Sequence, residues 1–168
     1  MWIPKRALLA FSLVATTALS LSLAVVALGD HGHGRGGSKI EQTLAPSVPT
    51  DPAFHGVTPG GAPWVLRRGE VSISRDRLDL RVRGLVIPTA PANGTPGPVT
   101  TISASLYCGA DADTAPAATS DHAPISRRGD ARIRDRSFDV PDTCLAPVVL
   151  VHPNGDTTHY IAVEGRRR

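Results

Sequence analysis

Three histidines are the clearest candidates for chemistry in this sequence. His152 and His159 flank the tetrapeptide 153–156 (PNGD), whose Asn-Gly pair is a strong signal for a β-hairpin. A two-residue turn would pair His152 with Thr157 and place both imidazoles on one solvent-facing side, where they can share a zinc or copper ion or supply a general base. His122 is the candidate third ligand. We favour solvent-exposed polar residues over a metal site, because strand faces beside turns are ordinarily polar.

Basic side chains alternate in the last third of the chain. Alternate residues of a β-strand share a face, so one stripe would contain Arg132, Arg134 and Arg136. Arg81 and Arg83 extend this stripe if the two strands are neighbours. A solvated strand face is the simplest interpretation, and a docking strip for an anionic polymer of the cell envelope is the functional alternative.

The distribution of charge argues against binding to nucleic acid. The 168 residues carry a formal net charge of +3. The excess lies at the two ends, in Lys5, Arg6 and the basic tail 166–168. Between residues 63 and 165, 11 arginines are balanced by 12 acidic residues. Such a balanced domain lacks the broad positive field that gathers phosphates.

The N-terminal sequence is typical of a secretory signal. A cationic start, residues 1–6, precedes an uncharged apolar run, residues 7–28, that ends in small residues. We predict a signal peptide over residues 1–28. The apolar run also has the roughly 20 residues that a membrane-spanning helix needs, so an uncleaved anchor is the alternative and the only membrane contact we expect. Residues 29–62, rich in Gly, Pro, Ser and Thr without apolar periodicity, predict a disordered linker.

The remaining residues, 63–165, predict one all-β domain. Short runs of alternating apolar and polar residues are separated by Gly, Pro, Asn and Asp. The alternation slips at Gly84, which predicts a bulge or bend, and residues 88–98 predict a projecting loop. We expect about six to eight strands in a small antiparallel β-sandwich of immunoglobulin-like architecture, or in a partly open barrel.

Cys108 and Cys144 are the only cysteines, and in an exported chain they predict one intramolecular disulfide. Cys108 ends the strand expected at 98–109, on the side that faces inward. A reactive thiol pair or a metal site is the alternative, although no CxxC spacing supports it. A true immunoglobulin domain is not indicated, because Trp64 precedes both cysteines instead of lying between them.

Five short motifs resemble a group of uncharacterised secreted proteins of actinobacteria. The motifs are GTPGPV (94–99), SLYCG (105–109), SRRGDA (126–131), CLAPVVLVHPNG (144–155) and YIA (160–162). The resemblance covers most of the part expected to fold. It implies a signal peptide, a β-rich domain and one disulfide, but no activity, ligand or catalytic residue.

Known catalytic motifs are missing from the sequence. It contains no GxSxG, HExxH or Walker pattern. We therefore predict no catalytic residue and no cofactor, in a secreted, non-catalytic module with an interaction or structural role on the outer side of the cell envelope. The expected partner is an anionic envelope polymer or a protein. The alternative is a small hydrolase, a metal-dependent enzyme or a metal-binding protein that uses His152 and His159.

Overall fold

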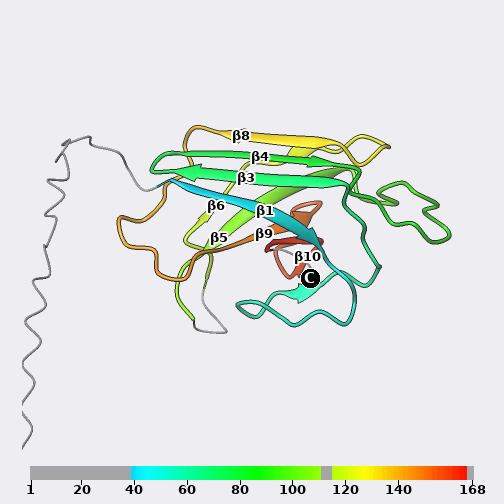
Figure 1. The fold of residues 1–168 in the computed structure, drawn as a ribbon, viewed down its shortest axis with the longest axis horizontal. Helices are drawn as coiled ribbons and strands as arrows, with labels where there is room; N and C mark the ends of the chain where they lie inside the picture. Colours follow the sequence, from blue (N-terminus) through cyan, green and yellow to red (C-terminus); the bar gives the residue numbers. More distant parts are fainter. Residues whose placement is uncertain (1–38, 111–114, 166–168) are drawn as a thin grey trace, which may run out of the picture. The chain divides into compact units, whose positions relative to one another are not determined.

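The computed structural model describes residues 39–110 and 115–165 (Figure 1). Within these ranges every regular element is a β-strand, which confirms the predicted all-β fold. The predicted signal peptide or anchor, residues 1–28, and the basic tail, residues 166–168, lie outside the described ranges. Inside them, no helix is long and apolar enough to cross a bilayer.

The strands are short and follow one another along the whole described part. They are β1 (Ile40–Pro46), β2 (Thr58–Pro59), β3 (Arg68–Ser74), β4 (Arg77–Arg83), β5 (Thr101–Tyr107), β6 (Ala118–Thr119), β7 (Ala123–Pro124), β8 (Ala131–Asp135), β9 (Val148–Pro153), β10 (His159–Tyr160) and β11 (Ala162–Glu164).

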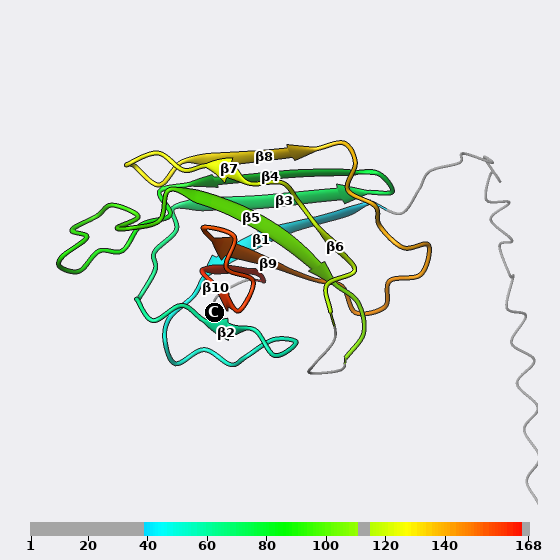
Figure 2. The same cartoon turned by 180° about the vertical axis from the view of Figure 1, so that it is seen from behind.

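Most of these strands belong to one antiparallel sheet that curls into a half-barrel (Figure 1). The strand order is β6-β5-β9-β11-β1-β3-β4-β8, and β7 also pairs with β5. The curl brings β7 close to β8 (Figure 2). A separate two-stranded sheet pairs β10 with β2 in parallel. Of the two architectures expected from the sequence, the partly open barrel describes this sheet.

Strand β1 joins the two halves of the sheet. Residues 40–43 pair with β3, and residues 44–46 pair with β11. The two halves face each other, and the inward-pointing residues of their strands form the main core. Its buried side chains include Ile73, Leu78, Leu80, Val82, Ile102, Leu106, Ile133, Val149 and Val151. Full burial of each such aliphatic side chain stabilises the fold by about 1.5 to 3 kcal/mol.

The β3–β4 hairpin forms as predicted. The two strands pair along their whole lengths around a turn at residues 75–76. At Gly84, where the alternation was expected to slip, φ is +66° and the strand has ended. The next residue, Leu85, is fully buried and its amide donates to the Gly129 carbonyl at 2.9 Å. Gly84 therefore redirects the chain, and residues 88–98 project as the expected loop (Figure 1).

The prediction of a disordered linker over residues 29–62 is wrong for the described residues of that range. Residues 40–46 form β1 in the middle of the sheet. Residues 47–63, here called the covering segment, include β2 and pack against the outward side of β5 and β9. Residues 29–38 lie outside the described part.

Scattered apolar side chains hold the covering segment in place. They help to form a second buried cluster, which contains Val57, Tyr107, Leu150 and Tyr160. The Tyr160 hydroxyl donates to the Pro52 carbonyl at 2.8 Å, and the Gly60 amide donates to the Tyr160 carbonyl at 2.8 Å. Tyr107 of β5 packs in this cluster, and all of residues 102–107 of β5 are buried. Isolated apolar residues without a period give no local signal for such packing.

The C-terminal hairpin has the predicted turn but a different register. Residues 154 and 155 have φ values of +48° and +75°, as a type I′ turn requires. The expected pairing of His152 with Thr157 is wrong. Strand β9 instead pairs with β11, with Val151 opposite Ala162.

A second turn explains this shift in register. The Asp156 carboxylate accepts a hydrogen bond from the Thr158 amide at 2.9 Å, a local arrangement that favours turns. The following residues form β10, which leaves β9 and pairs with β2 of the covering segment. A pattern that considers only two adjacent strands cannot anticipate this third partner.

The predicted disulfide between Cys108 and Cys144 is present. It connects the end of β5 to the loop before β9, with the two Cα atoms 5.0 Å apart. The bridge closes a chain segment with a sequence separation of 36.

Candidate functional site

The histidine with the strongest claim to chemistry is shut off from solvent. His152 has no exposed surface, and its Nδ1 lies 2.8 Å from the carbonyl oxygen of His159. A carbonyl oxygen only accepts hydrogen bonds, so Nδ1 carries the proton and Nε2 the lone pair. Among the described residues, Nε2 has no hydrogen-bond partner. Burial disfavours the imidazolium and lowers the pKa of His152, although the His159 carbonyl and the Asp156 carboxylate oppose this shift.

His159 belongs to a separate, exposed group. Its Nδ1 lies 2.9 Å from Asp156 Oδ2. Hydrogen bonds from the Thr158 side chain, from His159 and from the Thr158 amide lower the pKa of Asp156 to about 2. The Asp156 carboxylate is therefore ionised throughout the neutral range, where it stabilises the turn.

His122, the candidate third ligand, packs on the hairpin turn. A β-carbon built on Gly155 would lie 2.8 Å from His122 Nε2. Within residues 39–110 and 115–165, no three His, Cys, Asp or Glu side chains are placed to hold a metal ion. The structure therefore does not bring the three histidines together into one site.

The arginines behave differently, because the structure joins them on one exposed surface. Arg132 and Arg134 lie on β8, and Arg136 directly follows that strand. Strand β8 pairs with β4, so Arg81 lies directly opposite Arg132. Arg83 is exposed on the same side of β4. The exposed side of β3, β4 and β8, here called the outer face, therefore carries the predicted stripe and its extension.

Arginine lies opposite arginine twice on the outer face. Arg81 is paired in register with Arg132, and Arg83 with Arg68. The Cβ atoms of directly opposite residues in antiparallel strands are about 4.5 to 5.5 Å apart, and like charges at this distance destabilise the pairing. An anion placed between the guanidinium groups would remove that repulsion.

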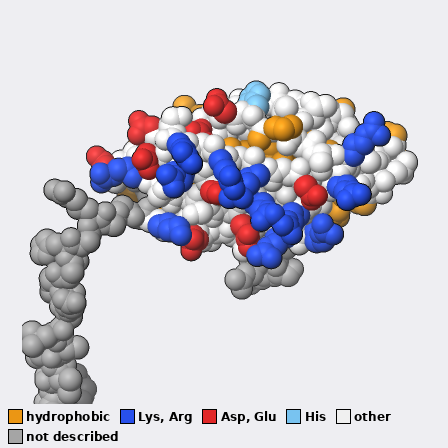
Figure 3. Space-filling model, turned by 90° about the horizontal axis from the view of Figure 1, so that it is seen from above, with side chains coloured by type: hydrophobic (Ala, Val, Ile, Leu, Met, Phe, Trp, Pro, Cys, Tyr) orange, Lys and Arg blue, Asp and Glu red, His pale blue; other side chains and the backbone are white. Residues whose placement is uncertain are grey.

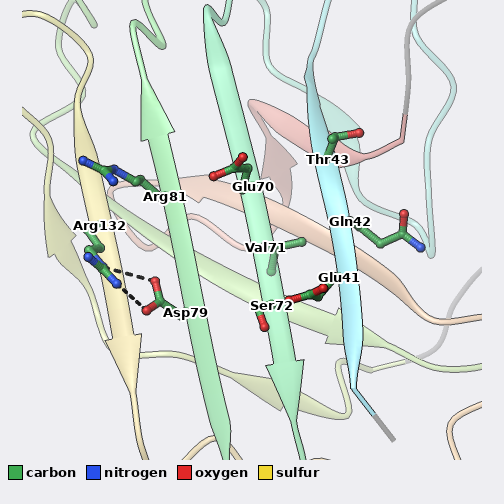
Figure 4. A pocket seen from close by; sticks show the side chains of 9 residues that line it. All are labelled: Glu41, Gln42, Thr43, Glu70, Val71, Ser72, Asp79, Arg81 and Arg132. Carbon is green, nitrogen blue, oxygen red and sulfur yellow. Dashed lines mark hydrogen bonds and ion pairs between the residues drawn. The ribbon is translucent and has the colours of Figure 1, made fainter.

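One arginine of each pair is neutralised by a carboxylate. Arg132 Nε donates to Asp79 Oδ1 at 3.1 Å (Figure 4), and Arg68 Nη2 donates to Glu70 Oε1 at 2.7 Å. All four groups are solvent-exposed, so each pair contributes about 0 to 1 kcal/mol to stability. Each guanidinium has five N–H donors, and these bonds leave donors free for a ligand.

The second arginine of each pair has no such partner. In the described part of the chain, neither Arg81 nor Arg83 forms an ion pair. Glu70 lies directly opposite Arg81 on β3, yet the Arg81 side chain extends away from it over β8 (Figure 4). The outer face therefore presents two uncompensated positive charges on alternate residues of one strand.

A shallow groove of about 640 Å³ adjoins these arginines (Figure 4). Its lining is rich in hydrogen-bonding side chains, including Glu41, Thr43, Glu70, Ser72, Asp79, Arg81 and Arg132. Seen from the side of β8, basic side chains form a broad band with carboxylates interspersed (Figure 3). The large apolar side chains exposed in the described part are Val65 and Leu145, so this part exposes no large aromatic ring.

The sequence prediction missed the contribution of β3 to this surface. Arg68, Glu70 and Ser72 alternate on one side of the strand, in register with the polar positions of β4. The short turn at 75–76 fixes that register and was visible in the sequence. Extending the polar pattern across the turn would have added Arg68 and Glu70.

No protein-family model, curated protein or solved structure matches this chain. The resemblance to secreted actinobacterial proteins stays a prediction. The geometry of the outer face is therefore the basis for a functional conclusion.

Proposed function

We propose that this chain is a secreted, non-catalytic β-module that binds anionic material of the cell envelope through its outer face. The observation that carries this proposal is the placement of Arg81 and Arg83, which lack ion pairs and lie opposite other arginines. Ion pairing within the described part of the chain does not account for these two arginines. A partner of opposite charge does account for them.

Two features support export. Disulfides such as Cys108–Cys144 form and persist in oxidising compartments and are rare in the cytosol. The sequence of residues 1–28 has the cationic start, apolar run and small-residue end of a signal peptide. Secretion is also what the resemblance to secreted actinobacterial proteins implies.

The alternative, a hydrolase or metal protein that uses His152 and His159, has less support. The ring of His152 is buried, so a substrate in solvent has no access to it. His159 is engaged with Asp156 at the surface. The hydrogen bond from His152 Nδ1 to the His159 carbonyl ties β9 to β10, and the contact of His159 with Asp156 ties β10 to the hairpin turn. Both histidines therefore have structural roles.

The proposal is tested by following the full chain, with its own N-terminus, in an exporting bacterial host. We expect a disulfide-bonded protein outside the cytoplasm that co-sediments with isolated cell walls and is released by salt. The double variant Arg81→Gln/Arg83→Gln should remain soluble in the same assay. A matched control, Arg127→Gln/Arg128→Gln, removes two exposed charges from the turn before β8 and should still sediment.

Two results would overturn the proposal. One is retention of the wild-type chain, reduced, in the cytoplasm. The other is equal sedimentation of the wild-type protein and the Arg81/Arg83 variant, because the outer face would then have no part in binding.

A further inference from the structure

We infer that the ligand of the outer face is a polyhydroxylated phosphodiester polymer that lies along β4. Arg81 and Arg83 would contact successive phosphates, with Arg132 and Arg68 beside them. This inference rests on the proposed function and names the chemical class of the ligand.

The spacing of the arginines favours a polymer over a single ion. Residues two apart on a strand are about 6.8 Å apart, and Arg81 and Arg83 point to the same side. Each has a second arginine directly across the ladder, Arg132 on one side and Arg68 on the other. The outer face therefore has two neighbouring positions for anionic groups, one between Arg81 and Arg132 and one between Arg83 and Arg68. A chain with regularly repeated charges fills both positions at once.

The geometry of the guanidinium groups favours phosphate. Arginine binds phosphate oxygens through two parallel N–H donors, which makes it more selective than a point charge. Two arginines on different strands approach each anionic position from different sides. A tetrahedral phosphodiester directs its non-bridging oxygens toward both, whereas the two oxygens of a carboxylate lie in one plane.

The groove beside the arginines favours hydroxyl groups between the phosphates. Thr43, Ser72, Glu41 and Glu70 line it next to Arg81. Carboxylate oxygens accept hydrogen bonds from hydroxyl groups but repel a dense polyanion. A polymer whose charges are separated by sugar or polyol units fits this surface better than one with an anion at every position.

Nucleic acid also contains phosphodiesters, but the surface lacks what bases need. Proteins that bind single strands without sequence preference stack the bases on aromatic side chains. In the described residues Trp64, Tyr107, Phe138 and Tyr160 are buried, and the half-buried Phe54 packs against Tyr160 in the covering segment, away from the outer face. We therefore assign the ligand to the polyol or sugar phosphates rather than to DNA or RNA.

The test is a titration of the full chain with a synthetic glycerol phosphate oligomer, followed by calorimetry at several salt concentrations. We expect an affinity that falls as salt rises. Arg81→Gln/Arg83→Gln should weaken binding by about tenfold or more and reduce the slope of log K against log salt by about 2, one for each lost contact. Arg127→Gln/Arg128→Gln is the control of equal charge and should keep most of the slope. Unchanged thermal unfolding shows that each variant is folded.

Two comparisons make the inference falsifiable. Arg81→Lys/Arg83→Lys keeps the charge but loses the two-pronged donor, so it should bind clearly more weakly than the wild type. If the lysine variant binds as tightly as the wild type, charge alone explains the binding, and the assignment to phosphate is wrong. Poly-L-glutamate or oligo(dT) that binds as tightly as the glycerol phosphate oligomer would overturn it as well.

The outcome also separates this inference from the function on which it rests. If the chain sediments with cell walls through Arg81 and Arg83 but does not bind the oligomer, the ligand class is wrong and the function stands. If it does neither, both are wrong.

Discussion

Ser103 on β5 lies directly opposite His152 on β9, and both side chains are buried. Ser103 Oγ and His152 Nε2 are both buried without a hydrogen-bond partner among the described residues. His152 Nδ1 is already engaged with the His159 carbonyl. A second proton on the ring would therefore place a charge in a buried position with little compensation.

This arrangement predicts acid sensitivity. The folded state lowers the pKa of His152 below its ordinary value of 6.5, so the unfolded chain takes up the proton first. The free energy of unfolding should be constant above pH 6.5 with respect to this group and should fall as pH decreases below it. Urea midpoints measured between about pH 8 and pH 5 check this.

The histidine variants distinguish this source of acid sensitivity from others. His152→Asn should be less stable overall but should lose the pH dependence near 6, whereas the exposed His159→Asn should keep it. Asp156, with its pKa lowered to about 2, loses its contribution only as pH falls from 3.8 toward 2, so the two windows do not overlap. A wild-type midpoint that does not change between pH 7 and pH 5 would contradict the prediction.

The disulfide should supply a large part of the stability. Replacing both cysteines, Cys108→Ser/Cys144→Ser, releases a constraint on the unfolded chain and should lower the free energy of unfolding by about 3 to 4 kcal/mol. Denaturant unfolding with and without dithiothreitol measures this loss. The reductant should destabilise the wild type to the level of the variant and leave the variant unchanged. If the reduced wild type and the variant differ in their free energy of unfolding, the serine side chains affect stability in addition to the loss of the disulfide.

Gly129 should tolerate no side chain. Its φ is +75°, and a β-carbon there would lie 2.5 Å from the backbone nitrogen of Leu85. Gly129→Ala should therefore cost on the order of 3 kcal/mol, from backbone strain together with a clash that cannot relax. Gly94 is the matched control, because its φ is +83° and nothing lies within 4 Å of a built β-carbon. Gly94→Ala should cost only about 1 kcal/mol, and equal losses at the two sites would count against the clash.

Arg81 should be nearly neutral for stability. It lies between Arg132 on β8, which is paired with Asp79, and Glu70 on β3, and it forms no ion pair in the described residues, so the opposing effects of Arg81→Gln should largely cancel. We expect the free energy of unfolding to change by no more than a few tenths of a kcal/mol at low salt, and by less at high salt. Arg127→Gln, in an exposed turn, should leave stability unchanged. Clear destabilisation by Arg81→Gln would show that this arginine has a structural role.

The sequence predicted the strands whose residues alternate, and it missed the parts that depend on distant contacts. Gly84 and the Asn154-Gly155 turn were found because positive φ selects particular residue types. The covering segment was missed because Val57 and its neighbours show no period, and their partners are Tyr107 and Leu150, far along the chain.

The predicted placement of the histidines depended on distant contacts and failed, whereas the predicted placement of the arginines depended on a local pattern and succeeded. The placement of His152 depended on the register of a three-stranded arrangement, in which Asp156 and β10 shift the pairing away from a simple hairpin. The arginine stripe depended only on alternation within one strand and on which strand lies next to it. The pairing of β4 with β8 supplied that neighbour and placed Arg81 beside Arg132.

The position of β1 between β3 and β11 has a consequence for how the protein is made. Residues 40–46 leave the ribosome before their partners at 162–164, which are synthesised more than a hundred residues later. The half-barrel cannot be completed before then, and pairings of such long range also form slowly. Until those residues are made, the polypeptide is incompletely folded, which is the state that a narrow translocation channel accepts.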